Sequence, residues 1–391
     1  MAKGKLGFNA AFAMAVGGMI GGGIFATLGV VISLAGSWAW LSFLIGGVIA
    51  LATGYSYARL TSHFGREGGA YTFLRETGHG SIAAPVAWVL ILGYTLTVSV
   101  YAYTFGAYLA HALGGPHWFA PASAVIAILI LAGVNLMGVG EAAGVEIVAV
   151  WGKLAVLGVL AVIGIARWQP EMLSLDHTTP GFTGALIGAA SVFMAYEGFQ
   201  LLAYDYDDMT NPDHVLRNAI SLAIICTAAV YIAVAIGCAM LVGASQIVED
   251  KEIALAEAGR QALGQTGFVG VTIAAALSTA SAINATLFST ARLSSEVSKQ
   301  GDLPSLFSRE DKEGVPYAGV LIIGAIAALL AVIGGLQNLV QAASFVFLGV
   351  FALVNWLSWR VVDHGRWQAM LGMVGASLAA IVLAAHLAGF I

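Results

Sequence analysis

Charged side chains are scarce in this sequence: they make up 9% of its 391 residues, whereas hydrophobic ones make up 59%. A soluble globular domain carries about 25% charged residues, so this composition excludes a water-soluble fold. Between the apolar runs, no polar stretch is long enough to form a separate folded domain. The sequence therefore predicts an all-α polytopic membrane protein in which the membrane-embedded part is the whole chain.

Cysteine is almost absent as well, and basic charge is nowhere concentrated. Cys226 and Cys238 are the only cysteines, and they fall in one apolar run, too far apart along a helix to form a disulfide. The 16 lysines and arginines form no basic stripe, so we expect no nucleic-acid partner. Neither metal-ligand spacing nor a cluster of catalytic side chains is visible. We therefore expect no metal, no cofactor and no enzymatic activity.

Apolar runs long enough to cross about 30 Å of hydrocarbon recur along the whole chain. They predict eleven spans, at residues 8–33, 38–62, 81–111, 119–138, 142–166, 182–203, 215–243, 266–298, 316–334, 337–359 and 367–390. The segment from Glu249 to Arg260, between the seventh and eighth spans, is typical of a short amphipathic helix and is expected to form part of a lid.

Lysine and arginine lie mostly in one set of alternate connections between these spans. That set holds Lys3, Lys5, Arg59, Arg66, Arg75, Arg217, Arg292, Lys299, Arg309, Lys312, Arg360 and Arg366, and the other holds only Arg167, Lys251 and Arg260. Positive residues resist translocation, so the N-terminus is predicted to be cytoplasmic and, with an odd number of spans, Ile391 to lie outside. We expect a multi-pass protein of the inner (plasma) membrane.

A cleaved signal peptide is the alternative for the N-terminus, because Ala11 to Ala13 resembles a cleavage site behind two lysines. The apolar stretch continues to Ser33, however, and its removal would spoil the charge asymmetry. An uncleaved first span is therefore favoured.

Five glycines fall within seven positions at the middle of the first span, in the segment Gly17 to Gly23. Each glycine costs about 1 kcal/mol of helix propensity relative to alanine, so the cluster predicts a broken helix. Unwound backbone in a bilayer is tolerated only where it is buried in protein or lines a cavity, so the break predicts a binding site. The amides of Gly21 to Gly23 could bind a carboxylate, and carbonyls near Gly18 and Met19 an ammonium. The alternative is that small residues merely let helices pack closely.

The sixth span has a matching feature at its middle, where Glu197 is followed by Gly198. A carboxylate at that depth is costly, so it should face a cavity or a partner. Interrupted helices at corresponding places in two halves are typical of inverted-repeat transporters with a site at the bilayer midplane. We therefore predict broken helices one and six, two five-helix repeats at residues 1–168 and 169–361, and a C-terminal helix at 362–391.

Lys153 is expected near the middle of the fifth span. A buried lysine can be neutral in one conformation and charged in another, as a proton carrier must be. Snorkelling or a salt bridge with Glu146 is the alternative. Ser278 and Ser281 of the eighth span share a helix face and could accept hydrogen bonds from the ammonium or coordinate a cation. A lysine against these hydroxyls would stand where a sodium ion might sit, which favours proton coupling.

Several short motifs occur in the order found in one transporter superfamily. They are Met19-Ile20-Gly21-Gly22-Gly23-Ile24-Phe25, Gly68-Gly69-Ala70-Tyr71, Phe193-Met194-Ala195-Tyr196-Glu197-Gly198-Phe199, Asp208-Met209-Thr210-Asn211-Pro212, and Ser281-Ala282-Ile283-Asn284-Ala285-Thr286 with Gly301-Asp302-Leu303-Pro304. Together they resemble the amino acid–polyamine–organocation superfamily, in particular its prokaryotic amino acid permeases. The resemblance implies a five-plus-five, LeuT-like inverted repeat. Most relatives have twelve spans, so with eleven any dimer contact through the twelfth is lost, and we expect a monomer or a weak homodimer.

The resemblance also implies roles for residues in these motifs. In similar proteins, the substrate carboxylate binds amides that match Gly21, Gly22 and Gly23, and the amino group binds carbonyls that match Met19, Met194 and Glu197. Ile20, Phe193 and Ala195 belong to the same two motifs, and Asn284 matches a position of the side-chain pocket. A lysine at the place of Lys153 marks the proton-coupled branch, where it contacts a carbonyl near Gly17 and the serines that match Ser278 and Ser281. The gating side chain, often aromatic in relatives, is Met194 here.

The combined prediction is a proton-coupled, sodium-independent permease that takes up amino acids by alternating access, with a small molecule, a proton and the lipid bilayer as its partners. An exchanger of amino acids or amines is the main alternative, and a passive channel is a remote one. The side chain of Glu197 leaves two possibilities open. If it faces the pocket, the substrate could be cationic, such as ornithine, agmatine or a polyamine; if it points away, it could carry protons together with Lys153.

Overall fold

The computed structural model describes residues 6–137, 143–175 and 181–391, and these residues are almost entirely helical. Between helices, the chain forms an isolated β-bridge from Leu6 to Met209. The α-helices are α1 (Phe8–Ala35), α2 (Ala39–Phe64), α3 (Ala70–Glu76), α4 (Gly80–Leu113), α5 (Phe119–Leu136), α6 (Ala143–Ala166), α7 (Gly181–Ser191), α8 (Pro212–Val242), α9 (Ala244–Asp250), α10 (Ala254–Lys299), α11 (Tyr317–Ile333), α12 (Leu336–Val361) and α13 (Arg366–Leu387). Short 3₁₀ helices are η1 (Gly36–Trp38), η2 (Pro170–Leu173), η3 (Phe193–Tyr196), η4 (Phe199–Asp208) and η5 (Lys251–Ile253).

The helices account for the predicted membrane spans. Eight helical stretches in the described ranges are long and apolar enough to cross a bilayer, and the bent pair of α7 with η3 and η4 makes a further one. The first stretch, Phe8–Phe64, contains two helices, because the chain turns at η1, where Gly36 has a φ of 53°. With these two counted separately and the shorter apolar α11 included, the eleven predicted spans are confirmed as helices. The chain is a multi-pass membrane protein.

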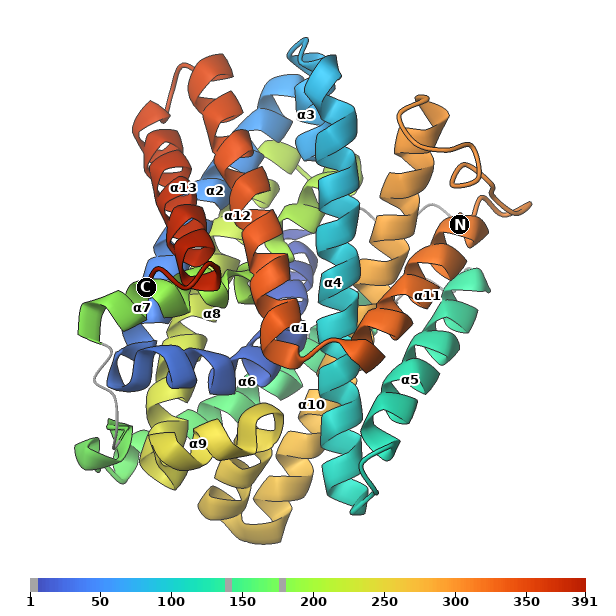
Figure 1. Cartoon of the computed structure of the whole chain (residues 1–391). Helices are drawn as coiled ribbons and strands as arrows, with labels where there is room; N and C mark the ends of the chain where they lie inside the picture. The colour runs from blue at the N-terminus through green and yellow to red at the C-terminus, as the bar shows by residue number, and fades with distance from the viewer. Residues whose placement is uncertain (1–5, 138–142, 176–180) are drawn as a thin grey trace.

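The spans differ in how much of their surface is left for lipid. In the most apolar part of the α1–α2 stretch, 94% of the residues are buried inside the protein, compared with 17% in α13. Figure 1 shows α12 and α13 side by side at one edge of the bundle and α5 and α11 at the opposite edge. α1 therefore lies at the centre, where every face of the helix meets another part of the chain.

The first span corrects the sequence prediction, because α1 is helical from Phe8 to Ala35 without a break in the glycine run. The amides of Gly21 to Gly23 lie inside this helix, where they are used in its own hydrogen bonds. Glycine lowers helix propensity by about 1 kcal/mol per residue, but each buried backbone group left without a partner costs about 1–3 kcal/mol. In a buried helix the second cost is the larger one, so the segment stays wound.

The glycines of α1 instead allow neighbouring segments to approach closely. A β-carbon on Gly22 would lie 2.0 Å from Cδ1 of Tyr101 in α4, and one on Gly21 would lie 2.7 Å from Cβ of Ala282 in α10. On Gly23 it would lie 2.3 Å from the hydroxyl of Tyr231 in α8. The close packing that the sequence left as an alternative is thus the role these glycines have in this structure.

The break predicted in the sixth span is confirmed. α7 ends at Ser191, and the helical direction changes by 55° between α7 and the segment formed by η3 and η4. Glu197 has an extended backbone, and Gly198 has a φ of 123°, which a residue with a side chain rarely adopts. The division of the chain into two repeats at residues 168 and 361 stays a prediction.

The segment between the seventh and eighth spans folds back on the bundle as a lid, which we define as residues 244–263. It contains α9, η5 and the first turns of α10, up to a kink at Leu263 and Gly264. The single helix predicted from Glu249 to Arg260 is wrong, because the chain turns at Lys251, whose φ is 47°, and the range is divided between these three elements. The lid rests on the second half of α1, where a β-carbon on Gly29 would lie 2.8 Å from the carbonyl oxygen of Lys251. In Figure 1, α9 is at the lower end of the molecule and α3 at the upper end.

The packing of α1 predicts that Gly22→Ala destabilises the protein. The added methyl group would overlap the Tyr101 ring, and overpacking of this kind costs about 1–3 kcal/mol. Thermal unfolding of the detergent-purified protein should therefore begin at a lower temperature. Gly152→Ala in α6 is the matched control, because a β-carbon there would have no neighbour within 4 Å. Equal melting temperatures for the two variants would show that the overlap with Tyr101 does not lower the stability of the protein.

Candidate functional site

A cavity of about 780 Å³ lies between α1, the break after α7 and α10. Its inner end is lined by small residues and one carboxylate: Gly17, Gly18, Glu197, Gly198, Ser281, Ala282 and Ala285. Its mouth is highly charged, with Arg66, Glu67, Asp205, Asp207, Arg292, Glu296, Lys299 and Glu310. The mouth residues come from the loop before α3, from η4 and from the end of α10 with the loop after it. The cavity is therefore open toward the end of the bundle that carries α3, and it is opposite the lid.

The cavity ends where α1 touches the break in the sixth span. A β-carbon on Gly18 would lie 3.1 Å from Cα of Gly198, and one on Gly198 would lie 2.6 Å from the carbonyl carbon of Gly18. Both residues line the cavity. The backbones of two helices thus meet directly, with no side chain between them, and this contact separates the cavity from the residues deeper in the bundle.

Beyond that contact, one tyrosine joins the two segments predicted to bind the substrate. The hydroxyl of Tyr231 lies 2.7 Å from the carbonyl oxygen of Met19 and 2.8 Å from that of Ala195, and it donates its single proton between them. Its ring lies against Phe43 and Tyr196 in an apolar shell. The two main chains are held together by a hydroxyl in the region where the sequence predicts that an ammonium binds.

The predicted site residues are thus brought together, but only some of them reach the cavity. Gly17, Glu197 and Ser281 line it. The remaining ones are packed in the interior: Met19, Ile20, Gly21, Gly22, Gly23, Phe193, Met194, Ala195, Ser278 and Asn284. Exposed amides at Gly21 to Gly23 were expected and are not found, because α1 is wound there. The main-chain amide of Met194 donates to the Ser344 hydroxyl at 2.9 Å, which anchors η3 to α12.

The carboxylate of Glu197 belongs to a buried polar cluster. The residue is 1% exposed, and its Oε1 accepts a hydrogen bond from Nε2 of Gln200 at 3.0 Å. Gln200 also contacts the Tyr94 hydroxyl at 3.2 Å and accepts a bond from the Gly198 amide at 2.9 Å. The Tyr101 hydroxyl lies near the same carboxylate. Gln200 therefore links the shape of the break to the position of the carboxylate.

Lys153 lies in α6 and is only 4% exposed, so it is buried as the sequence predicts. α6 packs against α1, α8 and α10, the last of which carries Ser278 and Ser281. The alternative salt bridge with Glu146 concerns a side chain outside the described part of the chain.

Among the residues that are described, no group of three or more histidine, cysteine or acidic side chains could hold a metal ion.

The sequence did not identify Tyr231, Gln200, Tyr94 or Tyr101 as parts of the site. A signal for them does exist, because a tyrosine hydroxyl or an amide buried in an apolar span must find a hydrogen-bond partner. The sequence could not identify that partner. The bonds made by Tyr231 cross from α8 to α1 and to η3, which lie 212 and 36 residues away.

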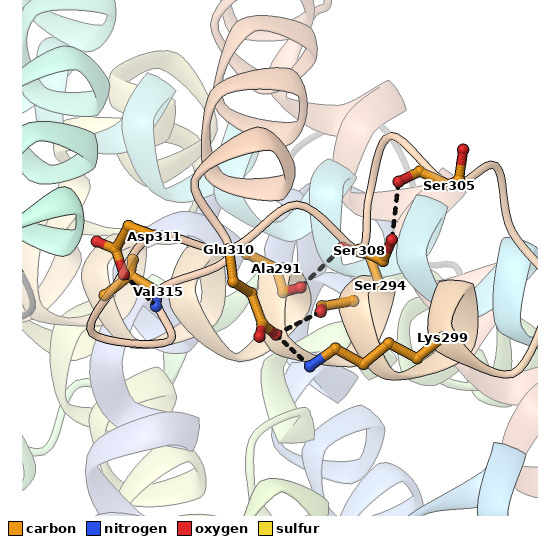
Figure 2. A network of polar contacts seen from close by, with 9 residues as sticks. Ala291, Ser294, Lys299, Ser305, Ser308, Glu310, Asp311 and Val315 are labelled. Atoms are coloured by element: carbon orange, nitrogen blue, oxygen red, sulfur yellow. Dashed lines mark hydrogen bonds and ion pairs between the residues drawn. The ribbon is translucent and has the colours of Figure 1, made fainter.

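At the mouth, the loop after α10 is held to the helix by one carboxylate. Glu310 accepts hydrogen bonds from Nζ of Lys299 at 2.5 Å and from the Ser295 hydroxyl at 2.7 Å, and Figure 2 shows this network. The hydrogen bond from Lys299, and then that from Ser295, lower the pKa of the Glu310 carboxyl below its ordinary value. A lowered pKa in the folded state means that the stabilisation is present at neutral pH and is lost as the pH falls through that pKa.

We therefore predict that Glu310→Gln loosens residues 300–316 at pH 7, and that the difference from the native protein shrinks as the pH falls through the lowered pKa of the carboxyl. Hydrogen–deuterium exchange of this loop, corrected for the chemical exchange rate at each pH, measures the difference. Glu313→Gln is the control, because Glu313 is an exposed acidic residue in the same loop. Equal protection of the native protein and the Glu310 variant at pH 7 would contradict the prediction.

Comparison with known proteins places the chain in one family. A family model described as amino acid permease matches residues 6–391. The inner membrane transport protein YbaT of Escherichia coli is 29% identical over 360 residues, covering 88% of this chain and 80% of that protein. The serine/threonine exchanger SteT of Bacillus subtilis is 25% identical over 307 residues, covering 77% and 70%. The methylthioribose transporter of the same organism is 25% identical over 368 residues, covering 89% and 78%.

The family match extends over nearly all of the chain and agrees with the multi-pass helical fold, the broken sixth span and the motifs around it. This chain belongs to the amino acid permease family, within the amino acid–polyamine–organocation superfamily.

Proposed function

We propose that the protein takes up amino acids across the inner membrane by alternating access, driven by protons and independent of sodium. The observation that carries this proposal is the one-sided cavity. It opens beside α3 and stops at the contact between Gly18 and Gly198, while the lid covers the other half of α1. A site reached from one side at a time is what a carrier needs, whereas a passive channel would need a path through both barriers. In this proposal the cavity mouth faces the cytoplasm and Ile391 lies outside, an orientation that the basic connections support.

The substrate site of the proposal lies directly behind that contact. When substrate enters, α1 unwinds at its glycines, so that the amides of Gly21, Gly22 and Gly23 can bind the carboxylate. Carbonyls of Met19, Met194 and Glu197 take the amino group. Ile20, Phe193 and Ala195 flank it, and Asn284 faces the substrate side chain. The carboxylate of Glu197 is bonded to Gln200 and is 1% exposed, which favours its role as a second proton carrier over binding of a cationic side chain.

Coupling in this proposal depends on Lys153. Lys153 is only 4% exposed, so the charged form of its amine is costly. Its protonation can therefore follow the conformation of the helices around it. Gly17, Ser278 and Ser281 supply the oxygens that receive the charged form. The proton then replaces a bound sodium ion, and its release toward the cytoplasm accompanies release of the substrate. The protein acts as a monomer or as a weak homodimer.

Uptake into proteoliposomes tests the proposal. We expect saturable uptake of at least one radiolabelled amino acid from the standard set, raised by an inward proton gradient and unchanged when sodium replaces potassium. Lys153→Met keeps most of the side-chain volume but cannot carry a proton, so uptake by it should lose the gradient dependence. Lys312→Met, which changes an exposed loop lysine, is the control. Gradient-driven uptake by the Lys153 variant equal to that of the native protein would contradict the coupling role.

Exchange is the second candidate, favoured by the similarity to a serine/threonine exchanger. The two modes differ in whether the empty carrier can reorient. Preloading the proteoliposomes with unlabelled amino acid should therefore accelerate entry of label only modestly in an uptake permease. An absolute requirement for preloading would favour the exchanger.

The Tyr231 bridge belongs to the empty carrier, because its hydroxyl occupies the place proposed for the substrate ammonium. Tyr231→Phe removes this donor. The Met19 carbonyl remains bonded within α1, but the Ala195 carbonyl in the break loses its partner, and an unpaired buried acceptor costs about 1–3 kcal/mol. We expect tighter substrate binding, by about tenfold, together with slower net uptake and preserved exchange. Isothermal titration and transport assays measure these quantities.

Tyr108→Phe is the matched control for this experiment, since the Tyr108 hydroxyl is buried and has no hydrogen-bond partner among the residues described. If Tyr231→Phe instead weakens binding and slows exchange as much as net uptake, the hydroxyl contacts the substrate itself.

A further inference from the structure

Three side chains join the lid to the end of α4, on the side of the molecule opposite the cavity. Nε2 of His111, in the last turn of α4, lies 2.7 Å from Oε1 of Glu257 in the lid. The other carboxylate oxygen of Glu257 accepts a hydrogen bond from Nε of Arg260 at 3.0 Å. One lid carboxylate is thus shared between a permanent cation and an imidazole, which is charged only when it is protonated.

An aromatic ring completes this junction. The guanidinium of Arg260 lies 4.1 Å from the centre of the Phe268 ring, and the His111 ring meets the same ring edge-on at 5.4 Å. Phe268 follows the kink at Leu263 and Gly264, so it belongs to the fixed part of α10 and not to the lid. The lid is therefore attached through Glu257 and Arg260 to two elements that stay in the bundle.

A kink in α10 separates the lid from the rest of that helix. Gly264 has a φ of 64°, and the backbones on its two sides touch, since a β-carbon on Gly267 would lie 2.0 Å from the Gly259 carbonyl oxygen. At its other end the lid lies on α1, where Lys251 contacts Gly29. Glu257 lies between these two points, so lifting the lid from α1 breaks its contact with His111.

Charged groups of the lid surround His111. Glu257 and Asp250 of the lid are the carboxylates that face it, Glu249 lies beside Asp250, and Arg260 is the opposing cation. The C-terminal end of α4 also attracts positive charge. Side chains of His111 and Glu257 are 33% and 21% exposed, so protons reach the pair directly from the adjacent water.

We propose that His111, Glu257 and Arg260 form a proton-sensitive latch, in which protonation of His111 holds the lid closed over the face opposite the cavity. With neutral His111, the bond to Glu257 is an ordinary hydrogen bond. With protonated His111, it becomes a charge-assisted one, which is about twice as strong. Acid on that side therefore slows opening of the lid.

Thiol labelling of the lid tests the latch without any assumption about the substrate. Cys226 and Cys238 are first replaced by serine and alanine. Ala258→Cys then places a single thiol on the buried underside of the lid, and Ser245→Cys places one on its exposed surface as a reference for the pH dependence of the reagent. The ratio of their labelling rates by a membrane-impermeant methanethiosulfonate reports how often the lid opens.

We expect this ratio to fall about threefold between pH 7.5 and 5.5. The change is small because a partly exposed ion pair stabilises a contact only weakly. His111→Gln should remove the fall, whereas His117→Gln, in an exposed loop, should retain it. Glu257→Gln should raise the ratio at both pH values, and adding His111→Gln to it should change nothing further, because the two residues act as one latch.

An unchanged pH dependence in His111→Gln would overturn the proposal, as would additive effects of the two substitutions. If Ala258→Cys disturbs folding, Ala256→Cys, which is also buried on the lid, replaces it. Because the labelling needs no transported substrate, a failure here leaves the proposed transport function untouched, and a failure of transport leaves this result interpretable.

Discussion

The direct contact between α1 and the break in the sixth span is the feature on which the rest of the structure depends. Gly18 and Gly198 meet backbone to backbone, and the Tyr231 hydroxyl bridges the carbonyls of Met19, which follows Gly18, and of Ala195, three residues before Gly198. Without β-carbons at these two positions the segments can approach closely enough for one hydroxyl to reach both. The cavity ends at this contact, so the same pair of glycines that joins the segments also sets the depth to which water and solutes penetrate.

The bilayer explains why the two glycine-containing segments behave differently. At the sixth span, Gly198 adopts a positive φ, and Gln200 supplies bonds to the Gly198 amide and to the Glu197 carboxylate, so the break is stabilised by the chain itself. At α1 the helix itself satisfies the amides of Gly21 to Gly23. A glycine cluster permits a break, but a nearby hydrogen-bonding partner is needed to maintain one.

This difference marks the limit of what the sequence could predict. Hydrophobic run lengths predicted all eleven spans, because the thickness of the bilayer constrains each helix separately. Glu197 and Gly198 predicted the sixth break correctly, since their own cost in a membrane demands local irregularity. The winding of α1 depends instead on Tyr101, Ala282 and Tyr231, which come from three other helices, and no local pattern in the first span contains that information. The motifs identified the family because they preserve both segments, whatever conformation each adopts.

On the proposed function, the wound α1 gives substrate a thermodynamic role in opening its own site. Unwinding the glycine run exposes amides and carbonyls whose burial without partners is costly, and an amino acid carries one carboxylate and one ammonium that can satisfy groups of both kinds. In its absence, the α1 hydrogen bonds satisfy the amides and the Tyr231 hydroxyl contributes a donor to the carbonyls. A molecule lacking either charged group would leave half of the exposed backbone unpaired. Selectivity for the zwitterionic backbone of an amino acid then follows from the cost of breaking a buried helix, before any contact with the substrate side chain is made.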